Sequence, residues 1–235
     1  MRSRLFGFYT ETVGFNKLKN LRLFKRLSFN FFKIINLSIS LIVLSLVATN
    51  AKAAQTIVVF GDSLSAAYGI QQNEGWVTLL QNKLKQENFD YKVVNASISG
   101  ETTSGGLGRF KAMLATHKPN IVVIELGAND GLRGLSIKEM QNNLNSMINQ
   151  AKAAKADVLL LGMKIPPNYG IQYTQQFSET YTDLAQKYSL NLVPFFLDSV
   201  AGNRTLVQDD GLHPKAVAQA KLLENVWPQL KKLLK

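Results

Sequence analysis

Short apolar runs alternate with amphipathic stretches along residues 55–235, and this alternation predicts the secondary structure. Apolar, often β-branched runs predict buried strands at 56–60, 91–94, 121–126, 158–163 and 190–193. Apolar residues at helical spacing predict helices at 74–86, 102–116, 136–154, 172–188 and 214–234. Alternating strands and helices are typical of βαβ units. The sequence therefore predicts one α/β domain, a three-layer sandwich in which a parallel sheet of about five strands carries helices on both faces.

Polar, glycine-containing turns follow the first three predicted strands. They lie at 61–63, 95–100 and 127–130. The carboxyl ends of parallel strands meet at one edge of a sheet, and ligands of open α/β sheets bind there. The sequence therefore predicts a functional site built from these three turns.

The first 53 residues differ from the rest of the chain in charge. They hold nine of the 27 Lys and Arg residues and one of the 16 Asp and Glu residues, which leaves 18 basic and 15 acidic residues, a net +3, for the remainder. Without a basic stripe in that remainder, we expect no nucleic-acid partner. The basic segment, the apolar stretch 35–47 and the sequence Ala-Lys-Ala at 51–53 predict a signal peptide, 1–53, cleaved after Ala53.

The alternative for this leader is a retained membrane anchor. Its apolar stretch is shorter than the roughly 20 residues that a membrane span needs, which favours the signal peptide. We therefore expect a domain over 54–235 that is periplasmic or secreted and has no stable membrane anchor after cleavage.

The chain has no cysteine and only two histidines, His117 and His213. Disulfides, thiolate catalysis and cysteine metal sites are excluded. Two histidines leave little from which to build a metal centre, so we expect no metal and no cofactor.

A serine, a histidine and a carboxylate stand at opposite ends of the domain. Ser63 lies in the Gly-Asp-Ser-Leu turn after the first strand, and Asp210 precedes His213 by three residues. Together they are the parts of a nucleophilic hydrolase, in which histidine takes the serine proton and a carboxylate orients the imidazole. Each part alone also fits an ordinary turn residue. We interpret Asp209 and His117 as solvated turn and loop residues.

Gly100 and Asn129 are candidates for an oxyanion hole. A backbone N–H at a glycine and an asparagine amide are both suitable donors to a tetrahedral intermediate, and the Ser63 N–H would be a third. Tyr169 follows the fourth strand in the loop 166–170, where Pro and Gly residues bracket a single large aromatic. It is a candidate substrate-binding residue, and inward packing of its ring is the equal alternative.

The order of these motifs resembles the SGNH (GDSL) hydrolase family. Its four name residues correspond here to Ser63, Gly100, Asn129 and His213, and the resemblance covers roughly 55–234. The segments 61–66, 94–100, 127–134 and 166–170 are most similar to a periplasmic subfamily of multifunctional acyl-CoA thioesterases, arylesterases and lysophospholipases of Gram-negative bacteria. One departure is Ala128, where the close relatives have glycine.

The resemblance implies the flavodoxin-like SGNH hydrolase fold and a monomeric serine esterase and thioesterase. Its expected substrates are small acyl esters, thioesters and lysophospholipids, hydrolysed through an acyl-enzyme on Ser63. The alternatives are a carbohydrate O-deacetylase of the same family and a non-catalytic carbohydrate- or lipid-binding relative, because a fold does not determine a function.

Overall fold

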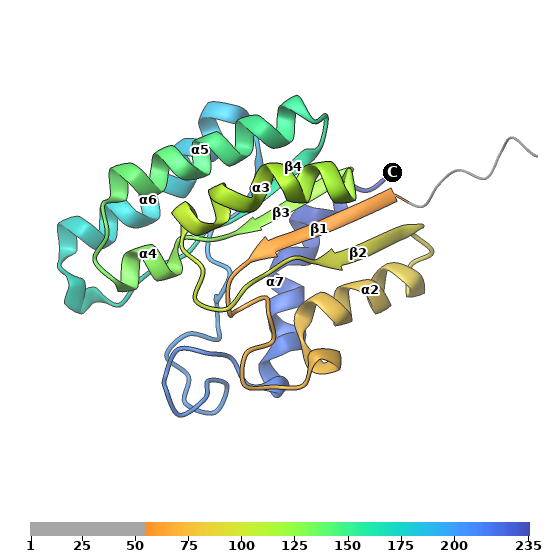
Figure 1. The fold of residues 1–235 in the computed structure, drawn as a ribbon. Coiled ribbons are helices and arrows are strands. Elements are labelled where there is room, and N and C mark those ends of the chain that lie inside the picture. Colours follow the sequence, from red (N-terminus) through yellow and green to blue (C-terminus); the bar gives the residue numbers. More distant parts are fainter. Residues whose placement is uncertain (1–54) are drawn as a thin grey trace, which may run out of the picture. The chain divides into compact units, whose positions relative to one another are not determined.

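The computed structural model describes residues 55–235, and the predicted leader with its cleavage site lies outside them. Five parallel strands form one sheet with the order β2-β1-β3-β4-β5 (Figure 1). The strands are β1 (Gln55–Gly61), β2 (Tyr91–Asn95), β3 (Ile121–Glu125), β4 (Asp157–Leu161) and β5 (Asn191–Val193).

Helices cover both faces of this sheet, so the predicted three-layer α/β fold is confirmed. The helices α3, α5 and α6 pack side by side on one face, and α2 and α7 pack together on the other (Figure 1). The α-helices are α2 (Trp76–Gln86), α3 (Thr103–His117), α4 (Ala128–Leu132), α5 (Ile137–Ala153), α6 (Ile171–Tyr188) and α7 (Gln219–Lys231). The 3-10 helices are η1 (Gln72–Glu74), η2 (Pro167–Tyr169) and η3 (Ala216–Ala218). No helix among residues 55–235 has both the length and the hydropathy that a membrane span requires.

The core lies on both sides of the central strands. All five residues of β3 are buried, as expected for a strand that is covered on both faces. Phe60 packs edge-on against Phe110 of α3, with ring centroids 5.0 Å apart. On the opposite face, Trp76 of α2 packs against Phe196 with centroids 5.4 Å apart. These apolar layers hold the strand ends in fixed positions.

The strand order explains where a site can form. The chain passes from β1 to β2 on one side, and then crosses back to β3 on the other side of β1. The loops after β1 and β3 therefore leave the sheet in opposite directions and open a crevice at its carboxyl edge. The β1 loop carries Ser63, and the β3 loop leads into α4, which carries Asn129.

Two segments differ from the sequence prediction. The last helix was expected from Pro214, but Pro214 is extended and pairs with Val207 in an antiparallel bridge, and α7 begins only at Gln219. The backbone N–H of Lys215 donates to the Leu206 carbonyl in this bridge, which keeps the segment out of the helix. The short helix α4 was read as a turn, because Asn-Asp-Gly is common turn sequence.

Candidate active site

The nucleophile candidate, Ser63, lies in a tight loop directly after β1. Asp62 organises this loop: its Oδ1 accepts the Leu64 N–H at 3.0 Å, and its carbonyl accepts the Ala66 N–H at 2.9 Å. The loop thus folds back on itself and leaves Ser63 half-buried at the wall of a cavity.

Ser63, His213 and Asp210 form one chain of hydrogen bonds, although Ser63 and His213 are 150 residues apart. His213 Nε2 lies 2.9 Å from Ser63 Oγ, and His213 Nδ1 lies 2.7 Å from Asp210 Oδ2. Asp210 Oδ1 also accepts the backbone N–H groups of Leu212 and His213. The His213 N–H is the main reason that the pKa of Asp210 falls to about 2. Asp210 is therefore charged at neutral pH and able to orient the imidazole.

A short antiparallel bridge frames the turn that carries this pair. Val207 pairs with Pro214, and the Gln208 N–H donates to the His213 carbonyl at 2.7 Å. The ring of Tyr68 packs against the His213 ring with centroids 4.5 Å apart. The structure thus pairs His213 with Asp210, whereas Asp209 is exposed and makes no hydrogen bond to His213.

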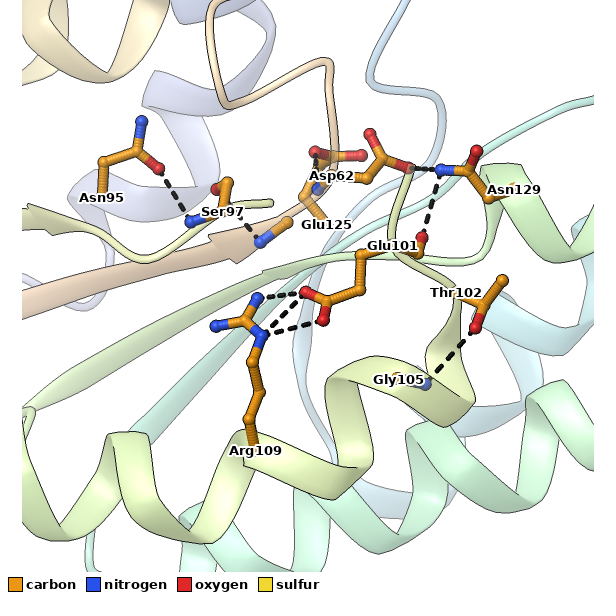
Figure 2. Close-up of polar contacts among 10 residues, drawn as sticks. Asp62, Asn95, Ser97, Glu101, Thr102, Gly105, Arg109, Glu125 and Asn129 are labelled. Carbon is orange, nitrogen blue, oxygen red and sulfur yellow. Dashed lines mark hydrogen bonds and ion pairs between the residues drawn. The ribbon is translucent and has the colours of Figure 1, made fainter. Parts of the chain in front are cut away.

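The candidate oxyanion donors line the same cavity as Ser63. Asn129 stands in the first turn of α4, and its Nδ2 donates to Asp62 Oδ2 at 2.9 Å and to the Glu101 carbonyl at 3.1 Å (Figure 2). Gly100 has a φ of 78°, and its carbonyl accepts a guanidinium N–H of Arg133 at 2.9 Å. Ser63, Gly100 and Asn129 are therefore brought together from the ends of three strands.

A second set of contacts fixes the Gly100 loop against α4. The Asp130 carboxylate accepts the Thr103 N–H at 2.8 Å and the Thr103 hydroxyl at 2.6 Å. Glu101 is held in a bidentate ion pair by Arg109 of α3, and Thr102 caps that helix (Figure 2). The position of the Glu101 carbonyl, and with it the Asn129 amide, is thus set by α3.

Two buried carboxyl groups lie beneath the site. Asp62 and Glu125 are both 0% exposed. Burial raises the pKa of Asp62 to about 6, an increase that hydrogen bonds from Leu64 and Asn129 limit. Burial also raises the pKa of Glu125 well above its usual range, and the charge of Asp62 adds to this effect. The sequence pattern predicted no role for these two residues or for Tyr68, although an acid that ends the apolar strand 121–125 was a visible signal.

The cavity beside Ser63 has a volume of about 660 Å³ and is mainly apolar. Its apolar walls include Leu132, Met163, Ile165, Phe195, Leu197 and Ala201. Pro166 and Pro167 also line it, whereas Tyr169 does not. Tyr169 is 37% exposed and its hydroxyl donates to the Leu132 carbonyl at 2.8 Å, so Tyr169 stands beside the cavity wall.

The other histidine lies far from this site. His117 ends α3, before β3 begins, and so belongs to the amino edge of the sheet. Among residues 55–235, no three His, Cys, Asp or Glu side chains are grouped closely enough to hold a metal ion.

Comparison with known proteins gives consistent matches. The sequence profile of the GDSL-like lipase/acylhydrolase family matches residues 59–221. Esterase TesA of Pseudomonas aeruginosa is 55% identical over 186 residues, 79% of this chain and 92% of that protein. Thioesterase 1/protease 1/lysophospholipase L1 of Escherichia coli K12 is 38% identical over 205 residues, 87% and 97% of the two chains. The crystal structure of the psychrotrophic esterase EstA from Pseudoalteromonas sp., inhibited by monoethylphosphonate, matches with a TM-score of 0.73 and 46% identity, covering 76% of this chain and 97% of that one.

Proposed function

The chain belongs to the GDSL-like lipase/acylhydrolase family and is a hydrolase of carboxylic ester and thioester bonds, and we propose that its nucleophile is Ser63. In this proposal His213 is the general base and acid, and Asp210 orients its ring and stabilises its positive charge. The observation that carries the assignment is the continuous chain of contacts at 2.9 and 2.7 Å from Ser63 Oγ through His213 to Asp210.

The proposed reaction has two halves. Ser63 Oγ attacks the acyl carbon while His213 Nε2 takes its proton, and the resulting imidazolium protonates the departing alcohol or thiol. This gives an ester between the acyl group and Ser63. Water then attacks the same carbon, with His213 again accepting a proton and returning it to Ser63 Oγ as the carboxylic acid leaves.

We assign the oxyanion hole to the N–H groups of Ser63 and Gly100 and to the Asn129 amide. Both hydrogens of the Asn129 amide are already engaged, one by Asp62 and one by the Glu101 carbonyl. A developing oxyanion therefore has to share or replace one of these acceptors. The bond that remains keeps the amide oriented, which is the preorganisation on which oxyanion stabilisation depends.

The cavity supports an acyl group as the part of the substrate that is bound. A volume of about 660 Å³ with mainly apolar walls is far larger than an acetyl group needs. This favours fatty acyl esters, acyl thioesters and lysophospholipids over acetylated carbohydrate, and the assembled triad disfavours a purely binding protein.

A hydrolysis panel tests this proposal. The purified protein is assayed with p-nitrophenyl esters from acetyl to palmitoyl, one acyl-CoA and one lysophospholipid, and the Ser63→Ala variant is the blank for each substrate. We expect kcat/KM to rise with acyl length beyond acetyl, because the longer chain buries more apolar surface. A maximum at acetyl would instead support the deacetylase.

We also propose that the protein is exported and that its mature form begins after Ala53. The basic and apolar leader and the small residues before the cut support this, and they lie outside the described residues. Mass spectrometry of protein from the periplasmic fraction tests it, with a mature N-terminus at Ala54 as the expected result. An intact leader recovered with the membrane fraction would contradict the proposal.

A further inference from the structure

Glu125 makes contacts that bracket Ser63, although it lies at the end of a different strand. Its Oε2 accepts the Asp62 N–H at 3.2 Å and the Ser65 hydroxyl at 2.7 Å. Asp62 directly precedes Ser63, and Ser65 follows it by two residues. The Ser65 Oγ in turn accepts the indole N–H of Trp76 at 3.2 Å, so its only proton is committed to Glu125. One carboxyl oxygen therefore holds the chain on both sides of Ser63.

The surroundings of Glu125 favour its neutral form. It is 0% exposed, and within residues 55–235 it has no basic side chain in ion-pair distance, while its carboxyl neighbour is Asp62. An ionised carboxylate in such a place costs far more than a protonated one. Oε2 accepts two hydrogen bonds, whereas Oε1 has no hydrogen-bond partner among the described residues. The proton of the neutral acid therefore belongs on Oε1. Burial accordingly raises the pKa of Glu125.

The fit around Glu125 is close. A Cβ at Gly61 would overlap Glu125 Oε2, so the end of β1 has to be glycine for the carboxyl group to reach the loop. From the other side, the Gly61 N–H donates to Ser97 Oγ at 3.1 Å, and Asn95 Oδ1 accepts the Ser97 N–H at 3.1 Å (Figure 2). The nucleophile loop is thus anchored to both strands that flank β1.

We propose that Glu125 is a positioning residue for the nucleophile: as an un-ionised acid, it fixes the backbone around Ser63 through the Asp62 N–H and the Ser65 hydroxyl. The hydrogen bond from the Asp62 N–H to Glu125 also fixes the Asp62 carboxylate, which accepts a hydrogen bond from the Asn129 amide. Glu125 thereby sets the spacing between the nucleophile and one oxyanion donor. This inference rests on the proposed role of Ser63.

Two substitutions separate hydrogen bonding from packing. Glu125→Gln keeps the size and an uncharged acceptor, and its NH₂ replaces the protonated Oε1. Glu125→Leu keeps comparable volume and removes the acceptor. We expect the Gln variant to stay within a few-fold of the parent. The Leu variant should lose about 10² in kcat with little change in KM, because a displaced nucleophile impairs reaction more than binding.

The measurement is kcat per active site in the full-length protein, with sites counted by covalent labelling with a fluorophosphonate probe. The control is Leu144→Ala, which empties a fully buried position on α5 that does not line the cavity beside Ser63. It should lower the thermal unfolding midpoint while keeping kcat per labelled site. A purely structural role of Glu125 would make the Leu variant behave in the same way.

Each outcome has a clear meaning. A loss per labelled site in Glu125→Leu that Glu125→Gln restores supports the inference. Equal losses in both variants, or parental kcat per site in the Leu variant, would overturn it while leaving the role of Ser63 intact. Labelling of the parent at a residue other than Ser63 would overturn both the proposed nucleophile and this inference.

Discussion

The two halves of the site are built in opposite ways. The acid–histidine half is a surface turn: the Asp210 side chain is 39% exposed, and its partners are within three residues of it in sequence. The nucleophile and oxyanion half, called the buried half below, rests on the fully buried carboxyl groups of Asp62 and Glu125 at the ends of β1 and β3. Its contacts join residues 60 to 67 positions apart, from Ser65 to Glu125 and from Asp62 to Asn129. One half is held by local, exposed contacts, and the other by contacts to buried carboxyl groups that are distant in sequence.

This difference also determines where negative charge resides. Backbone N–H donors lower the pKa of Asp210 to about 2, whereas burial raises the pKa of Asp62 to about 6 and that of Glu125 well above its usual range. The acid with the lowered pKa therefore lies beside His213, where it would stabilise the proposed imidazolium. Glu125, whose pKa burial raises, lies beneath the loop of the proposed nucleophile, where a further negative charge would oppose the proposed oxyanion.

The largest expected effect comes from removing Ser63 or His213, whose contact joins the two halves of the site. Ser63→Ala and His213→Ala should each remove most esterase activity, leaving the residual rate that binding and oxyanion stabilisation supply, about 10³–10⁴ over water. The control is Ser99→Ala, because Ser99 lines the same cavity and lies outside the chain of contacts. Steady-state kinetics with a p-nitrophenyl ester measure the activity of these variants and the control. Ordinary turnover by Ser63→Ala would show that the nucleophile is another group.

The exposed half is tested by two adjacent acids. Asp210→Asn should lower kcat by orders of magnitude, up to about 10⁴, because the amide supports the wrong imidazole tautomer and carries no charge. Asp209→Asn should stay within a few-fold, as is usual for a surface change. Parallel kcat measurements at one pH give the comparison. A larger loss in Asp209→Asn would mean that Asp209, and not Asp210, orients the imidazole.

The buried half is tested at Asn129. Asn129→Ala should cost about 10²–10³ in kcat with a much smaller change in KM, the signature of a donor used in the transition state. Asn143→Ala is a matched control, since its amide donates to Thr103 in the adjoining network and does not line the cavity. A loss confined to KM would make Asn129 a residue that positions the substrate.

The same comparison explains which features the sequence revealed. The strands and most helices followed from apolar periodicity, and their order fixed the layers. The three-residue spacing of Asp210 and His213 in a turn and the turn that follows the first strand made these residues and Ser63 candidates, and the resemblance to the SGNH family singled them out from ordinary turn residues. Glycine and asparagine in the turns after the other strands pointed to Gly100 and Asn129.

The buried half was not predictable in the same way. Nothing in the spacing of Asp62, Ser65 and Glu125 shows that strand pairing brings them within hydrogen-bond distance. Gly61 pairs with Glu125 across β1 and β3, and this register exists only once the sheet has formed. The start of α7 was misplaced for a similar reason, because the bridge between Val207 and Pro214 is a tertiary contact.

A smaller effect should be visible in stability. The folded-state pKa of Asp210 is about 2 against an ordinary value of 3.8, so its charge contributes stability above about pH 4, and this contribution is lost as the pH falls towards 2. The difference in unfolding free energy between the parent and Asp210→Asn should therefore shrink below pH 4. Urea melts from pH 3 to pH 7 measure it, with Asp209→Asn as the control for losing one exposed carboxylate. A difference that stays constant over this range would contradict the depressed pKa.

The smallest effect concerns Tyr169, which stands beside the cavity wall on the side of the buried half. Its hydroxyl donates to the Leu132 carbonyl, and Leu132 lines the cavity, so we expect Tyr169 to affect a bound acyl chain indirectly, through the cavity wall. Tyr169→Ala should change the ranking of short against long p-nitrophenyl esters by a few-fold and leave kcat for the acetyl ester close to the parent. Tyr169→Phe separates the contribution of the ring from that of the hydroxyl, because it keeps the ring and removes only the hydrogen bond to Leu132. An unchanged ranking in Tyr169→Ala with a lower unfolding midpoint would limit the residue to structure, and the acyl chain would then be bound by Pro166, Pro167 and the deeper apolar walls alone.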